Sequence, residues 1–200
     1  MKVVRLMLLT ALAVSALAAQ GSAGLMAGTV RYAHVDGPDT SVASGPLGGV
    51  KLGLEVGQIQ FHAEYAEGAI GGDRHVATGA LSGLVTMHPI LAVGLALSGF
   101  AHIDADATVH RWWGVELQAR AQYQPPEVPI MGFVTVMMTP LGGVTDTRGF
   151  GSLVGLESGV QMEVPRAPVV LELFYRVRRG AAEMLRNGME VVGVSAVVTF

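Results

Sequence analysis

Hydrophobic and polar residues alternate along most of this chain. Val50, Leu52 and Leu54 fall on one face of an extended strand, and Lys51 and Glu55 fall on the other. Because successive side chains of a strand point to opposite sides, this period of two predicts β-strands with one apolar face. About ten segments follow the pattern, each near or above the length that a tilted strand needs to cross a bilayer: residues 26–35, 47–56, 59–67, 76–87, 90–101, 111–123, 130–138, 150–164, 169–178 and 189–200.

Segment 130–138 is ambiguous, because it is apolar on both faces. A helix is an alternative there, although the segment is short for one and ends just ahead of Pro140. The count of ten strands depends on this segment, and eight strands is the alternative.

The segments between the strands alternate in length. Long connectors are expected at 36–46, 67–75, 102–110, 139–149 and 180–188, and short ones at 57–58, 88–90, 124–129 and 165–168. Outer-membrane barrels have short periplasmic turns and longer extracellular loops. The alternation therefore predicts every long loop on one side of a membrane and both termini on the other.

The composition favours a membrane protein over a soluble one. Hydrophobic residues make up 50% of the chain, charged residues only 14%, and the mean hydropathy is +0.47. The surface of a soluble domain is about 25–35% charged. A soluble lipocalin-like barrel is the alternative, but the polar faces of 76–87, 90–101 and 189–200 carry small uncharged residues, which suit a narrow interior better than a solvated surface. The net charge of −3 gives no reason to expect nucleic-acid binding, and the chain has 0 cysteines.

The two chain ends carry targeting signals. Residues 1–18 predict a secretory signal peptide, with a cationic start, an apolar stretch and the small residues Ala16-Leu17-Ala18 before the cut; cleavage after Ala23 and an uncleaved N-terminal anchor are alternatives. Residues 19–200 would then form a single barrel domain. At the other end, an apolar stripe of alternate residues runs out to Phe200, the last residue.

This C-terminal strand resembles that of bacterial outer-membrane β-barrels, whose last residue is typically Phe and serves as an assembly signal, although Val198 stands where those families often carry Tyr. With its strand pattern, the mature chain resembles small outer-membrane barrels of the OmpA/OmpX type. The resemblance implies an all-β fold, an antiparallel up-and-down transmembrane barrel in the cell outer membrane. It also implies insertion by the outer-membrane assembly machinery and a monomer. It carries no catalytic motif.

Charged residues on the polar faces predict ion pairs inside the barrel. A two-residue turn at 57–58 places Lys51 opposite Glu64, and a turn at 165–168 places Glu157 opposite Arg176. Directly opposed opposite charges stabilise a sheet modestly. A structural network that fills the lumen is the favoured interpretation, since small barrels have interiors filled by side chains. A gate that opens a small pore is the alternative.

The segment 102–110 is dense in residues that bind metals. His102, Asp104, Asp106 and His110 share one side of an extended stretch and could hold a divalent cation. The segment is weakly similar to the rim of outer-membrane proteases of the omptin family, but this chain looks too short for walls that reach far beyond the membrane. A solvated polar loop is the plainer interpretation.

Arginines gather near the expected long loops. Because guanidinium groups bind phosphates well, contact with lipopolysaccharide is expected for Arg74, Arg111, Arg148, Arg179 and Arg186. No cofactor is predicted and no catalytic triad stands out by spacing. The sequence therefore favours a structural or cell-surface interaction role with at most a narrow pore. An enzyme acting on lipid or peptide at the extracellular rim and a small-solute porin are the alternatives.

Overall fold

A computed structural model describes residues 19–36, 39–103, 109–144, 150–182 and 185–200. The predicted signal peptide, residues 1–18, lies outside these residues, and the first strand begins at Ala19. Within the described ranges, no helix is long and apolar enough to cross a bilayer.

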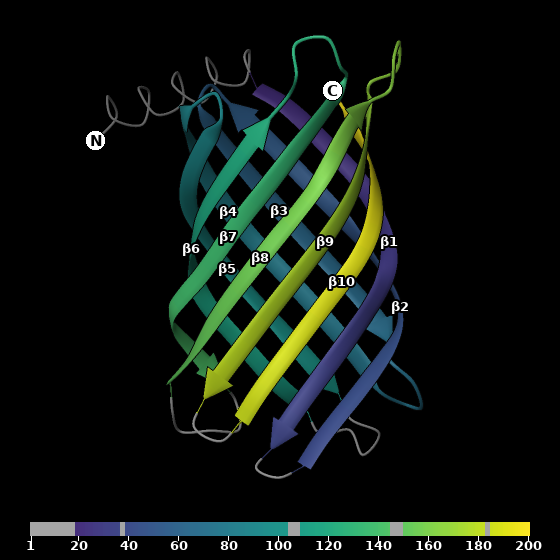
Figure 1. The fold of residues 1–200 in the computed structure, drawn as a ribbon, viewed down its shortest axis with the longest axis vertical. Coiled ribbons are helices and arrows are strands. Elements are labelled where there is room, and N and C mark those ends of the chain that lie inside the picture. The colour runs from purple at the N-terminus through teal and green to yellow at the C-terminus, as the bar shows by residue number, and fades with distance from the viewer. Residues whose placement is uncertain (1–18, 37–38, 104–108, 145–149, 183–184) are drawn as a thin grey trace, which may run out of the picture.

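The chain forms one closed barrel of ten antiparallel strands, each paired with its neighbours in sequence (Figure 1). β10 returns to pair with β1, so no strand edge is left open. The predicted all-β, up-and-down architecture is confirmed, with ten strands rather than eight. The strands are β1 (Ala19–Asp36), β2 (Asp39–Val56), β3 (Ile59–Ala69), β4 (His75–His88), β5 (Leu91–Ile103), β6 (Val109–Tyr123), β7 (Ile130–Val144), β8 (Phe150–Glu163), β9 (Val169–Ala182) and β10 (Leu185–Thr199).

The ambiguous segment 130–138 belongs to β7, so the helical alternative is wrong. Its inner face carries Phe133 and Met137, which are buried in the lumen. Its outer face carries Val134 and Val136, which are exposed on the wall. The buried face is largely apolar although it borders charged groups, because Phe133 packs against the Arg120 guanidinium and Met137 lies beside Arg178, with the polar Thr135 between them. Pro140 follows at an irregularity in the β7–β8 pairing, where a strand tolerates a missing N–H.

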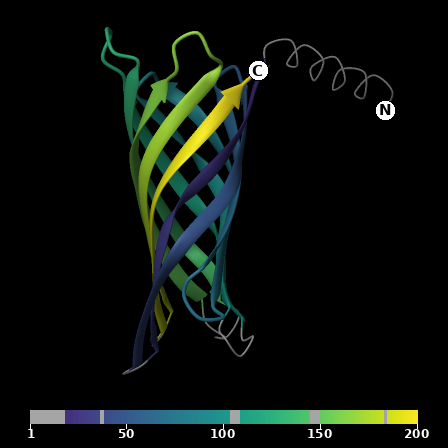
Figure 2. The ribbon, with the colours of Figure 1, turned by 90° about the vertical axis from the view of Figure 1, so that its right-hand side faces the viewer.

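Both ends of the described chain lie at one end of the barrel, here called the termini end (Figure 1). Figure 2 shows β1 and β10 side by side where the barrel closes. At the termini end, Gly21 and Phe200 exchange two backbone hydrogen bonds of 2.8 and 2.9 Å. The last residue of the chain therefore takes part in the seam. The opposite end is called the far end.

The predicted alternation of long and short connectors is wrong. β2 begins at Asp39 and β10 at Leu185, well before the expected starts, because these extra residues pair with β1. The pairs Thr40–Val35 and Gly188–Ala33 are examples. Small and polar residues resemble loop in sequence, but a neighbouring strand satisfies their backbone groups all the same. The connectors left at the far end are 37–38, 70–74, 104–108, 145–149 and 183–184; those at the termini end are 57–58, 89–90, 124–129 and 164–168.

The outer surface is apolar on every strand. On β6, the exposed Trp113 and Tyr123 mark the two edges of this belt. At about 3.3 Å per residue and a tilt of about 40°, the distance between them along the barrel axis is about 25 Å, the height of the lipid-facing band of membrane barrels. Phe61 and Phe200 add aromatic rings near the termini end. Exposed apolar residues on successive strands include Leu25, Leu52, Phe61, Leu81, Leu95, Val115, Val136, Val154, Leu173 and Val194.

The wall is taller than this belt. β1 and β2 have 18 residues each, which at the same rise and tilt span about 45 Å. The β1–β2 hairpin therefore extends beyond the belt at the far end. This extension comes from the strand pairing of residues that the sequence assigned to long loops.

Candidate functional site: the lumen

The far half of the lumen is packed with apolar and aromatic side chains. Trp112 is stacked on Phe100, with ring centroids 5.9 Å apart, and Phe100 meets Tyr32 edge to face at 6.3 Å. All three side chains are buried. Gly180 makes room for this packing, because a Cβ there would lie 2.6 Å from the Trp112 ring. Buried residues of the same cluster include Val30, Leu47, Ala66, Ile70, Val76, Leu153, Met189 and Val191.

His102 belongs to this packed half and not to an exposed loop. Its ring lies 4.4 Å from that of Tyr32 and 6.4 Å from that of His34, which shares a 2.6 Å hydrogen bond with Asn187. Only 3% of His102 is exposed. The interpretation of segment 102–110 as a solvated polar loop is wrong for His102, because β5 continues to Ile103 and carries this side chain inward.

The remainder of the predicted metal site is not placed. Asp104 and Asp106 lie outside the described residues. His110 lies in β6, where its backbone pairs with that of His102, but its side chain is not described. No group of three or more metal-binding side chains forms among the described residues.

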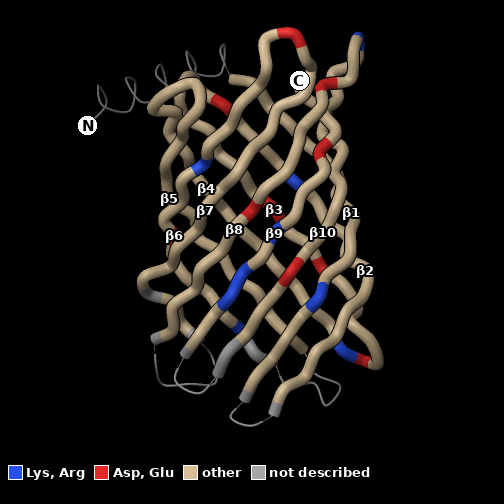
Figure 3. Tube along the Cα trace, viewed as in Figure 1, with Lys and Arg blue, Asp and Glu red and all other residues tan. Residues whose placement is uncertain are grey.

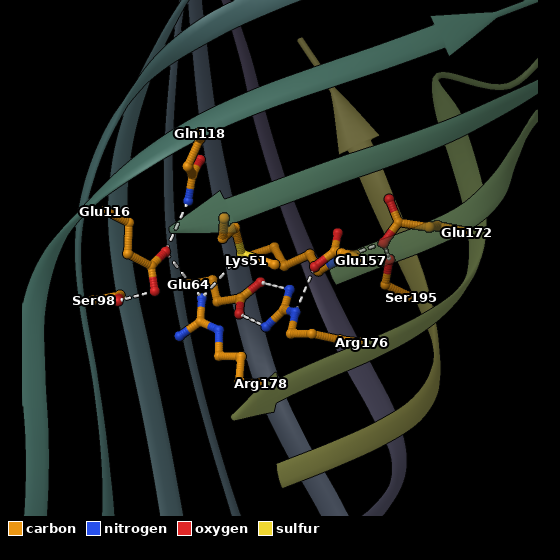
Figure 4. A network of polar contacts seen from close by, with 11 residues as sticks. Lys51, Glu64, Ser98, Glu116, Gln118, Glu157, Glu172, Arg176, Arg178 and Ser195 are labelled. Carbon is orange, nitrogen blue, oxygen red and sulfur yellow. Dashed lines mark hydrogen bonds and ion pairs between the residues drawn. The ribbon is translucent and has the colours of Figure 1, made fainter. Parts of the chain in front are cut away.

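The middle of the lumen holds a guanidinium clamped by two carboxylates (Figure 4). Arg176, which is 4% exposed, donates through Nη2 to Glu64 at 2.8 Å and through Nη1 to the same carboxylate. Its Nε donates to Glu157. The predicted register of Glu157 opposite Arg176 is confirmed, and the two side chains form the expected ion pair. Glu64 reaches the same arginine from β3, across the barrel.

Lys51 makes a different pair from the one predicted. It lies directly opposite Glu64 in the β2–β3 ladder, as the two-residue turn requires, and Gly57 takes the positive φ of 62° that such a turn needs. The Lys51 ammonium, however, binds Glu172 of β9. Glu172 also accepts from Gln161 at 2.6 Å and from Ser195 at 3.5 Å. Register was predictable from the turn, whereas the partner across the lumen was not.

A third group lies next to the aromatic half. Glu116 is fully buried and accepts hydrogen bonds from Ser98 at 2.5 Å and from Gln118 at 3.1 Å. Arg178 Nη2 lies 3.6 Å from the same carboxylate. The sequence predicted that these side chains share the polar face. It offered no signal for their grouping, because the contacts join separate strands at a depth set by strand tilt.

A cavity of about 270 Å³ lies among these groups in the termini half. Ser22 and Thr199 line it close to the termini end, and Met137 and Arg178 line its deepest part. Its wall is charged, with Lys51, Glu64, Arg120, Glu157, Glu172, Arg176 and Arg178 contributing. The lumen is therefore divided into a packed far half and a polar termini half.

Of the arginines predicted to face lipopolysaccharide, Arg179 lies apart from the lumen network. Figure 3 shows how few charged residues interrupt the wall. Arg179 points outward near the far end and lies 3.8 Å from Glu190, which also pairs with the outward-facing Arg31 at 3.4 Å. Arg111 is exposed and Arg74 is half-buried. Arg148 lies outside the described residues, and the side chain of Arg186, in β10, is not described.

The comparisons with known proteins agree with this architecture. No protein-family model matches the sequence, and no curated protein matches it. Among solved structures, the outer-membrane protease OmpT from Escherichia coli is similar with a TM-score of 0.61 at 8% identity, over 91% of this chain and 96% of that one. Neisserial surface protein A (TM-score 0.42, 13% identity, 86% and 95% covered) and an outer-membrane channel from Pseudomonas putida F1 (0.46, 8%, 90% and 95%) also match. This chain has the fold of a bacterial outer-membrane β-barrel.

Proposed function

We propose that this protein is an integral barrel of the outer membrane with a closed lumen, and that it has a structural or cell-surface interaction role. The observation that carries the proposal is the packing of the far half of the lumen. Buried rings such as Trp112, Phe100 and Tyr32 occupy the space that a water-filled pore would need. This packing favours the plugged barrel over a small-solute porin.

The outer surface supports membrane insertion. A belt about 25 Å high with aromatic rings such as Trp113 and Tyr123 at its edges matches the lipid-facing band of membrane barrels. The termini end would face the periplasm and the far end the cell exterior. The protein should fractionate with outer membranes and migrate differently on gels before and after boiling. Recovery of the mature chain as a soluble periplasmic protein would refute this location.

Conductance in planar bilayers tests the closed lumen. We expect the folded wild-type barrel to give no regular current steps beyond those of the detergent alone. Replacing the central rings with Phe100→Gly and Trp112→Gly in one chain should open a passage and produce them, provided that the variant still shows a heat-modifiable folded band. Large steady steps from the wild type would instead support the porin alternative.

Lipopolysaccharide is the proposed lipid partner at the far end. Arg31 of β1 and Arg179 of β9 lie just beyond the apolar belt, on either side of β10. They line a groove of about 550 Å³, together with small residues such as Ala33 and Gly188. Guanidinium groups at this level suit the lipid phosphates. Added lipopolysaccharide should raise the unfolding temperature of the wild type and have less effect on Arg31→Gln/Arg179→Gln.

The control for the lipid experiment is Arg166→Gln, since Arg166 is exposed in the turn at the termini end. An equal response of all three proteins to lipopolysaccharide would exclude this groove as the contact. The same proposal for Arg74, Arg111, Arg148 and Arg186 remains a prediction. The alternative of an enzyme at the rim, for which the sequence names no catalytic residue, also remains a prediction.

A further inference from the structure

The cavity in the termini half is a blind pocket. Its lining runs from Ser22 and Thr199, near the chain ends, to Arg178 and Met137. Beyond Arg178, the lumen is filled by the packed rings around Trp112. A solute in this cavity would therefore enter and leave from the termini end. At about 270 Å³, the space is slightly below the range of about 300–1,000 Å³ that holds drug-sized ligands.

Arg178 brings unused hydrogen-bond donors to the floor of this cavity. The side chain is 2% exposed, and its Nη2 lies 3.6 Å from Glu116 and 3.7 Å from the sulfur of Met137. Its Nε and Nη1 are buried without a hydrogen-bond partner among the described residues. A buried charged donor that makes no hydrogen bond costs free energy, so we expect a hydrogen-bond acceptor in the cavity.

Arg120 brings a second guanidinium to the same wall. Its charged group lies 4.2 Å from the centre of the Phe133 ring, and its Nε has no hydrogen-bond partner within the described ranges. The described residues place no carboxylate within ion-pair distance of it. The carboxylates that line the cavity are already engaged, since Glu64 and Glu157 bind Arg176 and Glu172 binds Lys51. Arg120 is thus held in the lumen by its ring contact and not by an ion pair.

We propose that this cavity binds a small anion that carries a phosphate or carboxylate group, with Arg120 and Arg178 as its principal donors. Guanidinium groups present forked N–H donors that match the geometry of both oxyanions. Glu64 and Glu157 form ion pairs with Arg176, and Glu172 forms one with Lys51, so Arg120 and Arg178 can donate to the ligand. Apolar neighbours such as Leu84 and Val170 would cover the rest of a small organic anion.

Titration calorimetry of the refolded barrel in zwitterionic detergent tests the proposal, with inorganic phosphate and acetate as separate probes. We expect saturable binding of at least one probe. Arg120→Gln should weaken it at least tenfold, because this variant removes the charge without breaking an ion pair. Arg166→Gln is the matched control, since Arg166 is exposed in the turn at the termini end and does not line the cavity, and it should bind as the wild type does.

Arg178→Gln should weaken binding to a similar degree, although it also removes the cation beside Glu116 and can impair folding. Heat-modifiable migration shows which variants are folded. If Arg178→Gln does not fold, the comparison of wild type with Arg120→Gln still decides the test. Absence of saturable binding by either probe, or equal binding by wild type and Arg120→Gln, would show that the cavity holds water only and would overturn the proposal.

Discussion

Different interactions stabilise the two halves of the lumen. In the far half, Trp112, Phe100 and Tyr32 pack as the core of a soluble domain does, and water is excluded. In the termini half, Arg176 and Lys51 bind carboxylates around a cavity of about 270 Å³. The outer wall faces apolar surroundings in both halves, so removal of apolar surface from water takes place chiefly inside. The far half therefore forms a packed core, whereas the termini half contains a cavity that a small solute can enter.

The largest expected effect is on the packed half. Trp112→Ala should lower the free energy of unfolding by about 3–5 kcal/mol, because it removes a buried ring and leaves a cavity. Urea unfolding of the barrel in lipid vesicles measures this. The neighbouring Trp113 is the matched control, since it is 60% exposed on the outer wall. Trp113→Ala should cost about 1 kcal/mol or less. Equal losses in the two variants would mean that the far half is not the core.

Removal of Arg176 should have the next largest effect. Arg176→Met leaves Glu64 and Glu157 in the lumen without their shared cation. Loss of one partner of a buried ion pair costs about 3–5 kcal/mol, and partial hydration from the cavity should keep the loss near the lower value. The same unfolding assay applies. Adding Glu64→Gln to this variant should recover part of the stability, and no recovery would indicate that Arg176 acts through packing alone.

Loss of Lys51 should have a smaller effect than loss of Arg176, although both residues lie in the polar half. The Lys51 side chain is 16% exposed, and its partner Glu172 keeps hydrogen bonds from Gln161 and Ser195 when Lys51 is lost. Lys51→Met should therefore reduce the free energy of unfolding by about 1.5–3 kcal/mol, the range for a hydrogen bond to a charged group, and by less than Arg176→Met. A loss as large as that of Arg176→Met would show that Lys51 lies in surroundings as dry as those of Arg176.

Deletion of Phe200 should have the smallest effect on stability in vitro. The ring is 78% exposed on the outer surface near Gly21, so its burial should contribute less than the roughly 1.5–3 kcal/mol of a fully covered Phe. We expect refolding in detergent to be almost unchanged. In cells, the yield of folded protein should fall, with aggregation or proteolysis in the periplasm, because the terminal aromatic resembles an assembly signal.

Equal damage in cells and in detergent would assign Phe200 to packing instead of recognition. If neither the yield in cells nor refolding in detergent falls, Phe200 has no role in assembly.

Local geometry explains which parts of the site were predictable. The pairs Lys51–Glu64 and Glu157–Arg176 follow from turns a few residues away, and both registers are confirmed. The contacts of Lys51 with Glu172 and of Arg176 with Glu64 join residues 121 and 112 positions apart. They depend on the tilt and stagger of the whole barrel, which alternation along single strands does not encode.

The limits of the strands were less predictable than their number. Residues 39–46 are mostly small or polar and carry little strand preference of their own. They are strand because β1 lies alongside, as the Thr40–Val35 pair shows. The same extension carries β5 to Ile103, which places His102 among rings instead of on a rim. An expected ligand was thus misplaced by an error in strand length.

The seam between Gly21 and Phe200 has a consequence for how the protein is made. β1 is the first strand to be synthesised, and one of its two neighbours is β10, the last. The sheet therefore stays open until β10 has been made, however early the other hairpins form. A truncated product keeps two bare edges and exposes them to proteases and to other chains. The ring of hydrogen bonds can thus close only in a chain that contains all ten strands.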